Sequence, residues 1–175
     1  MPTTQLAKLA GLTVISSASR PESIAWTQQH GANLVVNHRH NLVSEVHALG
    51  IKDVDYILGL SDLDSHWNEI CTLVKPDGHI ASITENRRPI DLKKLTKKRR
   101  IFAWKWMYSK SYYHTADMIS QHDILETIAG LLDRGLLQST LSQTLRPINA
   151  LRLWQAHQLI EQHHMISKVV IDGWE

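Results

Sequence analysis

The chain has 175 residues, of which 43% are apolar and 21% are charged, and its formal net charge at pH 7 is +2. This composition is typical of a globular domain with a real hydrophobic core, and the balanced charge excludes a strong electrostatic bias of the whole molecule. The chain has no apolar run long enough to span a bilayer, no signal peptide and a single cysteine, Cys71. We therefore expect a cytoplasmic protein without disulfides or a cysteine-based zinc site.

The first half of the chain alternates between apolar runs and segments of helical period. A helix from Gln5 ends at Gly11, and the turn signal Lys75-Pro76-Asp77-Gly78 separates a later helix from a strand. The other predicted helices are 21–30, 42–49 and 62–74, and the predicted strands are 12–16, 32–37, 54–58 and 79–83. Strands that alternate with helices in this way predict a parallel sheet covered by helices on both faces.

The second half begins with a polar, basic segment over 91–100. It is followed by predicted strands 101–108, 141–145 and 167–171 and predicted helices 117–134 and 147–162, the last with Pro147 in its first turn. The basic cluster 93–100 precedes several aromatic residues, a combination that can bind nucleic acid. Because the overall charge is balanced, a solvated loop before an edge strand is the favoured alternative.

Four stretches of the chain resemble the carboxyl-terminal part of the medium-chain dehydrogenase/reductases, in the quinone-oxidoreductase and zinc-type alcohol-dehydrogenase-like branch. They are 5–19, Gly31-Ala32-Asn33-Leu34-Val35-Val36-Asn37-His38-Arg39, 74–80, and 144–156 followed by Ser167-Lys168-Val169-Val170. The resemblance implies an α/β, Rossmann-like, mostly parallel sheet with helices on both faces. It implies a dinucleotide-binding domain over 1–139, and a helix and strand over 140–175 that pack on a catalytic domain.

The chain departs from the pattern of this family in three ways. It lacks the first strand and the Gly-rich phosphate loop of the dinucleotide fold, and it lacks the amino-terminal catalytic domain. Ser167 stands where the family usually has Gly, and His38 stands where it usually has Tyr. Members of the family transfer a hydride from NADPH to a carbonyl, enone or quinone, so the resemblance implies an NADP(H)-binding fragment that is inactive alone, with no zinc. A non-catalytic interaction module that retains the fold is the alternative, and a nucleic-acid binder is a second one.

The turn after the strand 12–16 carries the clearest cofactor signal. In a dinucleotide fold this turn meets the adenosine ribose, and an acidic residue there selects NAD. The turn holds Ser19 and Arg20, and no acidic residue occurs before Glu22. A hydroxyl and a guanidinium suit a phosphate, which favours NADP. The alternatives are that Ser19 caps the following helix and that Arg20 is a free surface charge.

Five further residues are candidate cofactor contacts. By resemblance, His38 lies near the adenosine phosphate, with a solvent-exposed histidine as the alternative. Gly59 follows the next strand and permits close approach of a cofactor, or it only forms a turn. Ile83 and Phe102 stand where the family's backbone lies beside the nicotinamide, although plain core packing is the favoured alternative for both. The resemblance adds Lys168 to this set.

The missing Gly-rich loop leads us to expect weak or absent NADP(H) binding by this chain alone. Backbone N–H groups of that loop normally hold the pyrophosphate, and each charge-assisted bond contributes about 1.5–3 kcal/mol. We also expect a homo-oligomer, because the absent central strand leaves its two neighbours unpaired. These neighbours either slide together or accept a strand from another chain, and the family also pairs its last strand, here 101–108, across a two-fold axis. We expect neither a membrane nor a nucleic acid as partner.

Overall fold

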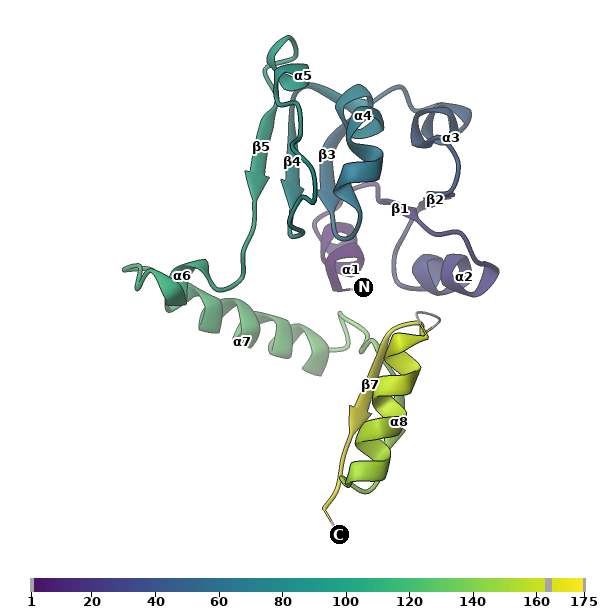
Figure 1. Ribbon diagram of the computed structural model, residues 1–175, viewed down its shortest axis with the longest axis vertical. Helices are drawn as coiled ribbons and strands as arrows, with labels where there is room; N and C mark the ends of the chain where they lie inside the picture. Colours follow the sequence, from purple (N-terminus) through teal and green to yellow (C-terminus); the bar gives the residue numbers. More distant parts are fainter. Residues whose placement is uncertain (1, 163–164, 175) are drawn as a thin grey trace. The chain divides into compact units, whose positions relative to one another are not determined.

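The computed structural model describes residues 2–162 and 165–174 (Figure 1). The helices are α1 (Pro2–Leu9), α2 (Pro21–Gln29), α3 (Leu42–Ala48), α4 (Leu63–Leu73), α5 (Lys93–Thr96), α6 (Ser109–Tyr112), α7 (Ser120–Asp133) and α8 (Ala150–Glu161). The strands are β1 (Ile15–Ser17), β2 (Leu34–Val36), β3 (Val54–Gly59), β4 (Val74–Ser82), β5 (Ile101–Trp104), β6 (Leu141–Leu145) and β7 (Lys168–Ile171). No helix in these ranges has the length and apolarity needed to cross a membrane.

The chain divides into two compact units. Val36–Gln121 forms a continuous unit, and Met1–Val35 together with His122–Glu175 forms a discontinuous unit. The division into 1–139 and 140–175 that the sequence suggests stays a prediction.

The continuous unit is built on a sheet of strand order β3-β4-β5, in which both pairs are parallel. Helices α3 and α4 alternate with these strands along the chain, as expected for a Rossmann-like α/β fold (Figure 1). The register places Gly59 beside Ser82 and Ser82 beside Trp104. The carboxyl ends of the three strands therefore lie in one row, at the edge where parallel α/β sheets bind ligands.

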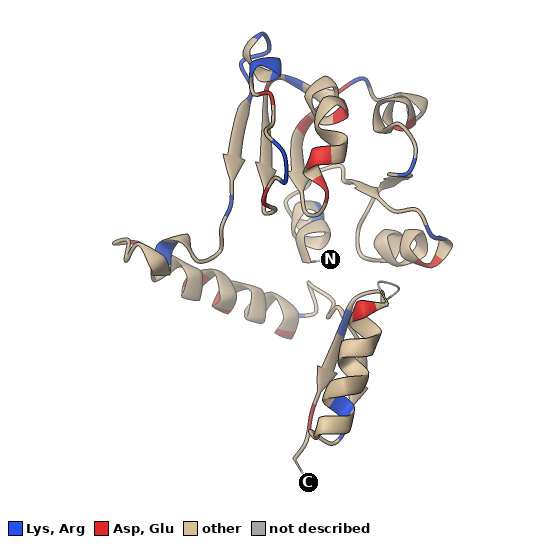
Figure 2. Ribbon diagram, in the orientation of Figure 1, with Lys and Arg blue, Asp and Glu red and all other residues tan. Residues whose placement is uncertain are grey.

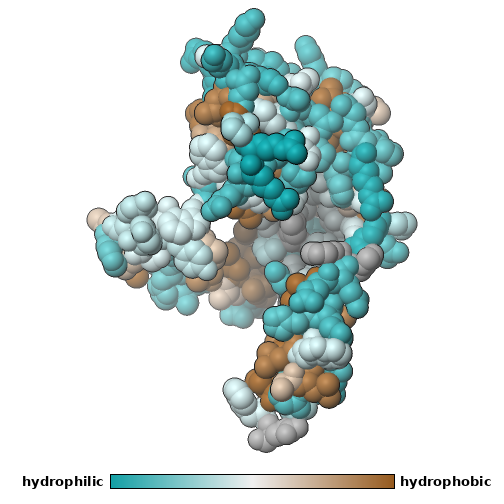
Figure 3. All heavy atoms as spheres, viewed as in Figure 1, coloured by the Kyte–Doolittle hydropathy of each residue, from teal (hydrophilic) through white to brown (hydrophobic). Residues whose placement is uncertain are grey.

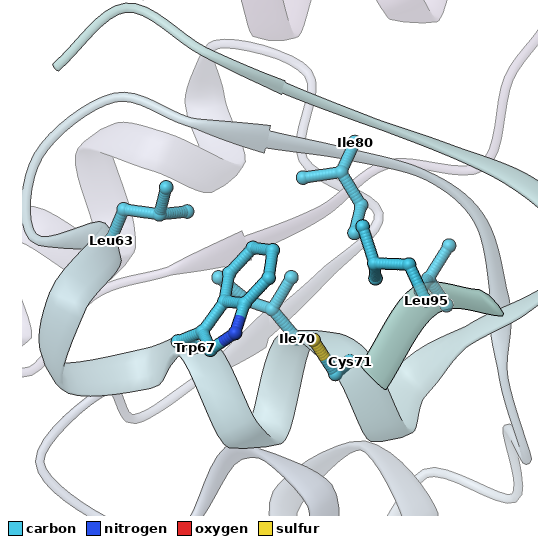
Figure 4. Close-up of a cluster of buried hydrophobic side chains, with 7 residues drawn as sticks. Leu63, Trp67, Ile70, Cys71, Ile80 and Leu95 are labelled. Carbon is cyan, nitrogen blue, oxygen red and sulfur yellow. The ribbon is translucent and has the colours of Figure 1, made fainter. Parts of the chain in front are cut away.

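The hydrophobic core of this unit lies between α4 and β4. Leu63, Trp67, Ile70 and Cys71 recur at the spacing of one helical face, and all four are buried. Together with Val74, Ile80 and Leu95 they form the main buried cluster (Figure 4). Full burial of one such aliphatic side chain stabilises the fold by about 1.5–3 kcal/mol. The carboxylate of Asp62 begins α4 by accepting the Ser65 N–H at 3.1 Å.

The remaining strands form two smaller sheets, β1-β2 and β6-β7, the second of which is parallel. Strand β1 and strand β3 belong to different sheets and to different units. Whether these two strands close the expected gap or accept a strand from another chain stays a prediction.

Four sequence expectations about elements need correction. Strand β4 begins at Val74, so the expected turn 75–78 is an irregularity inside a strand, where the pairing passes from Val54–Val74 to Tyr56–His79. Asp77 in this segment has φ 58°, which bends the chain locally. Strand β5 ends at Trp104 rather than at residue 108, and the basic segment contains the short helix α5. Helix α8 begins after Pro147 because Asn149 occupies its N-cap and accepts the Arg152 N–H.

Candidate functional site

Ser19 and Arg20 lie between the end of β1 and the start of α2. Ala18, which follows β1, is buried, and both Ser19 and Arg20 are half-buried. The N-cap of α2 is Arg20, with φ −105° and ψ 143°, and it makes no side-chain capping bond. The alternative that Ser19 caps this helix is therefore wrong. The turn presents a hydroxyl and a guanidinium side by side, which is chemistry that suits a phosphate.

His38 is exposed in the turn that follows β2. Partial burial, and then the nearby charges of His66 and Arg39, hold the pKa of His38 below its ordinary value. The neutral form of the ring is therefore favoured, and in that form one ring nitrogen can donate an N–H to a phosphate. Its exposure agrees with the solvent-exposed alternative.

A polar network fixes the turn that contains His38. Glu45 of α3 accepts the Asn37 N–H at 3.0 Å and lies 2.9 Å from the Nδ1 of His40. These two contacts, the backbone bond first, lower the pKa of the Glu45 carboxyl. Asn41 caps α3 and donates to Glu69 of α4 at 2.8 Å, so the turn is tied to both helices.

Gly59 and Ile83 lie at the ends of β3 and β4. The Ile83 N–H donates to the Gly59 carbonyl at 3.2 Å. A Cβ on Gly59 would lie 3.0 Å from Cδ1 of Leu63, so the glycine allows α4 to approach the strand closely. Ile83 is 55% exposed, which makes core packing the wrong alternative for that residue.

Phe102 is half-buried and packs against the main buried cluster, so core packing is confirmed for it. Its ring stands edge-on to Trp67, with centroids 5.5 Å apart, and edge-on to Trp104, with centroids 4.6 Å apart. The three aromatic rings of Trp67, Phe102 and Trp104 are thus in successive edge-to-face contact, from the buried core to the exposed surface. Phe102 therefore positions Trp104 at the end of β5.

Lys168 is the exposed first residue of β7, and its backbone N–H donates to the Thr140 carbonyl at 3.1 Å. It follows Ser167, which has φ 80°. The candidates thus fall into two sets: His38, Gly59, Ile83 and Phe102 in the continuous unit, and Ser19, Arg20 and Lys168 in the discontinuous one. Within the continuous unit, the strand ends bring Gly59 and Ile83 together.

Sequence reasoning missed a hydrogen-bonded group beside these strand ends. Asp64 accepts from Asn86 at 2.6 Å and from the Arg87 N–H at 2.7 Å, and the Trp104 ring N–H donates to Asn86 at 3.1 Å. The fully buried Ser82 contacts the Thr84 hydroxyl at 3.1 Å. These partners are up to 23 residues apart, and the position of Trp104 in a predicted strand is the single available signal.

The basic cluster 93–100, where blue gathers around α5 in Figure 2, makes hydrogen bonds within the fold. Lys98 donates to the carbonyls of Thr72 and Val74 at 3.1 and 3.2 Å, where a cation stabilises the carboxyl end of α4. Arg100 donates to the Lys94 carbonyl at 3.0 Å. These bonds give part of the cluster an internal structural role.

The described residues contain no group of three or more His, Cys, Asp and Glu side chains that could hold a metal ion. Cys71 is buried in the core, and burial raises the pKa of its thiol. The interpretation of Cys71 as a buried thiol rather than a nucleophile is confirmed.

Comparison with known proteins gives consistent results. The sequence model of a family described as zinc-binding dehydrogenase matches residues 30–171. A zinc-type alcohol dehydrogenase-like protein of Staphylococcus aureus (strain MSSA476) is 39% identical over 169 residues, which are 97% of this chain and 50% of that protein. A putative zinc-dependent alcohol dehydrogenase of Rhizobium etli CFN 42 superposes with a TM-score of 0.90 at 35% identity, covering 98% of this chain and 50% of the other. The fold of an NAD-dependent alcohol dehydrogenase is also similar, with a TM-score of 0.75 at 23% identity, and the match covers 96% of this chain and 46% of the other.

Proposed function

Because the chain belongs to the zinc-binding dehydrogenase family, we propose that it supplies the nucleotide-binding half of an NADP(H)-dependent oxidoreductase. Membership in this family confirms the resemblance of the sequence to the medium-chain dehydrogenase/reductases, and the superposition confirms the Rossmann-like α/β fold. The chain spans about half the length of the relatives it matches. We therefore propose hydride transfer to a carbonyl, enone or quinone for an assembly that also contains a counterpart of the half of the relatives that this chain does not match. These 175 residues alone would not convert substrate.

The observation that carries the choice of cofactor is the turn after β1. Ser19 and Arg20 stand between the strand and α2, and the first acidic side chain is Glu22 in the first turn of that helix. A carboxylate in this turn would repel the 2′-phosphate of NADP, whereas a guanidinium attracts it. Within the continuous unit, we propose His38 as an N–H donor to a phosphate of the cofactor, Gly59 as a point of close approach and Ile83 as a contact of the nicotinamide. When bound, the cofactor supplies the hydride.

Titration of the chain with NADPH and NADH tests this choice. The sequence has no Gly-x-Gly-x-x-Gly segment, so we expect weak binding, with a dissociation constant for NADPH on the order of 1 mM. We expect NADPH to bind about tenfold more tightly than NADH, and Arg20→Gln to abolish that preference. Arg134→Gln, which removes an exposed arginine of the same discontinuous unit, is the matched control.

Two results would contradict these expectations, the first the choice of cofactor and the second the weak binding. Equal affinity for NADH and NADPH would remove the phosphate-binding role of Ser19 and Arg20. A micromolar constant for NADPH would show that the Gly-rich loop is dispensable here.

Zinc does not fit the described residues, because they bring no three metal-binding side chains together and the lone cysteine is buried. We therefore derive no step through a metal ion. With that single buried cysteine, we also propose a cytoplasmic location.

A homo-oligomer through β5 is part of the proposal. Among the described strands, β5 pairs with β4 alone, so its other edge is open. In the segment that follows β5 along the chain, Trp106, Met107 and Tyr108 are 50–71% exposed. Exposed strand edges and large apolar residues favour pairing with a second copy. Sedimentation should show a dimer or larger species, and a stable monomer at high concentration would contradict this.

Helix α8 also exposes apolar surface on two sides, with Leu151 and Trp154 on one side and Leu153 and Ile160 on the other (Figure 3). We propose that this apolar surface of α8 is covered by a counterpart of the half of the relatives that this chain does not match. This surface also supports the alternative that the chain is a non-catalytic interaction module. Binding of NADPH with the preference described above would separate the two.

A further inference from the structure

A hollow of about 440 Å³ opens at the carboxyl ends of β4 and β5, within the continuous unit. It is lined by the loop that follows β4, including Asn86, Arg87, Arg88 and Ile90, and by Trp104 at the end of β5. The only charged side chains among its lining residues are the two arginines, both exposed. The hollow is therefore apolar in most of its wall and positively charged at one side. Figure 2 shows the basic colour on this loop between β4 and α5.

Asp64 of α4 holds the start of the loop. Its carboxylate accepts from Asn86 at 2.6 Å, from the Arg87 N–H at 2.7 Å and from the backbone of Arg88. The Asp64 carboxylate is therefore bonded to the backbone of the loop and to the Asn86 side-chain amide. The positions of Arg87 and Arg88 are thus fixed through their main chain, and both side chains are exposed, with the Asp62 carboxylate within electrostatic reach of Arg87.

The end of the loop is held by the core. Ile90 packs against the main buried cluster, and the ring N–H of the buried Trp67 donates to the Asp91 carbonyl at 3.2 Å. The loop is anchored at both ends, so a ligand would meet a wall that needs little ordering on binding.

Trp104, at the end of β5, also lines the hollow and is held as firmly. Its ring N–H is satisfied by Asn86, and its ring stands against Phe102, which contacts Trp67. The indole is nevertheless 55% exposed. Because its polar edge is already bonded, what remains open is apolar ring surface, on which a flat ring can stack.

We propose that this hollow binds a small, flat organic acid, with its carboxylate at Arg87 and Arg88 and its ring on Trp104. A guanidinium matches a carboxylate with two parallel N–H donors, and two of them on one fixed loop suit a single anionic group. The exposed indole selects for a planar body on that anion. The proposal concerns the continuous unit alone and does not require NADP(H).

Titration of the ¹⁵N-labelled chain with 2-naphthoate, without cofactor, tests the proposal. The ring N–H signal of Trp104, assigned with Trp104→Phe, and the backbone amides of Arg87 and Arg88 should shift saturably, with a dissociation constant on the order of 0.1–1 mM. The uncharged 2-naphthalenemethanol and inorganic phosphate should each bind about tenfold more weakly, because each lacks one of the two recognised features.

Variants separate the charge from the ring. Arg87→Gln with Arg88→Gln should weaken 2-naphthoate about tenfold or more, whereas the control Arg39→Gln should leave the titration unchanged. Trp104→Leu should reduce the difference between 2-naphthoate and inorganic phosphate, and the spectrum of each variant reports whether it folds.

Three outcomes would overturn the proposal. In the first, no saturable shift occurs at these residues. In the second, the neutral compound binds as tightly as 2-naphthoate. In the third, the Trp104 signal shifts with protein concentration and not with ligand, which would mean that a second copy of the chain occupies the hollow.

Discussion

Replacing Ser167 by glycine should stabilise the protein. Ser167 has φ 80°, a conformation that L-residues other than glycine avoid, and its hydroxyl is buried without a hydrogen-bond partner in the described ranges. It is also the position where the family usually has Gly. The residue leads directly into β7, so its backbone conformation sets the start of the β6-β7 pair.

The magnitude follows from three effects. Relief of the left-handed conformation contributes about 1–2 kcal/mol, and removal of an unpaired buried hydroxyl contributes about 1–3 kcal/mol. The greater freedom of glycine in the unfolded chain costs up to about 1 kcal/mol. With the full glycine cost subtracted, the net expectation is a stabilisation of about 1–4 kcal/mol, which for a chain of this size raises Tm by about 2–4 °C per kcal/mol.

Thermal and urea unfolding of the wild type, Ser167→Gly and Ser167→Ala measure the effect. Alanine removes the hydroxyl but keeps the backbone penalty, so its gain should be smaller than that of glycine. If glycine is no better than alanine, the backbone conformation at this residue stores no strain. A loss of stability in Ser167→Gly would refute the whole reasoning.

Three further predictions concern the core, the thiol and the loop. Gly78→Ala should destabilise by about 1–3 kcal/mol, because its Cβ would lie 2.6 Å from Val74, whereas Gly130→Ala in α7 meets nothing within 4 Å and should stabilise by up to about 1 kcal/mol in urea unfolding. Cys71, buried and with a raised pKa, should react with Ellman's reagent at pH 8 far more slowly in the native protein than in urea, and equal rates would contradict its burial. Hydrogen bonds from Asn86 and the loop backbone lower the pKa of Asp64. The stability that its carboxylate provides is therefore complete above about pH 4 and is lost as the pH falls through the lowered pKa. The Trp104 ring N–H signal should report this loss in the wild type, and Asp64→Asn should show no such titration.

The sequence predicted most elements because their signals are local. Helix α4 combines an apolar face with the Asp62 cap, and α2 begins at Pro21 as predicted. Strand β5 was predicted too long because the alternation of apolar residues continues past Trp104 into aromatic residues that are exposed. Hydropathy alone does not distinguish a strand from such an exposed aromatic segment.

The candidate site was less predictable because its contacts are long-range. The pattern identified the strand ends that carry Gly59 and Ile83, since parallel strands end at one edge. It did not reveal the bonds of Asp64 with the loop 86–88 or the anchoring of Trp104, because those depend on how α4, β4 and β5 pack. The sequence does not predict the hydrogen bonds from Lys98 to the end of α4 for the same reason.

The two units differ in how they are laid out along the chain, and this affects the order in which they can fold during synthesis. The continuous unit is a single stretch of 36–121, so it can close as soon as that stretch has left the ribosome. The discontinuous unit must wait, because Gln5 of α1 exchanges two hydrogen bonds with the backbone of Gln138, 133 residues later. For that interval the two α1 side chains that the folded unit buries, Thr4 and Gln5, remain open to water, so this early segment completes its packing last.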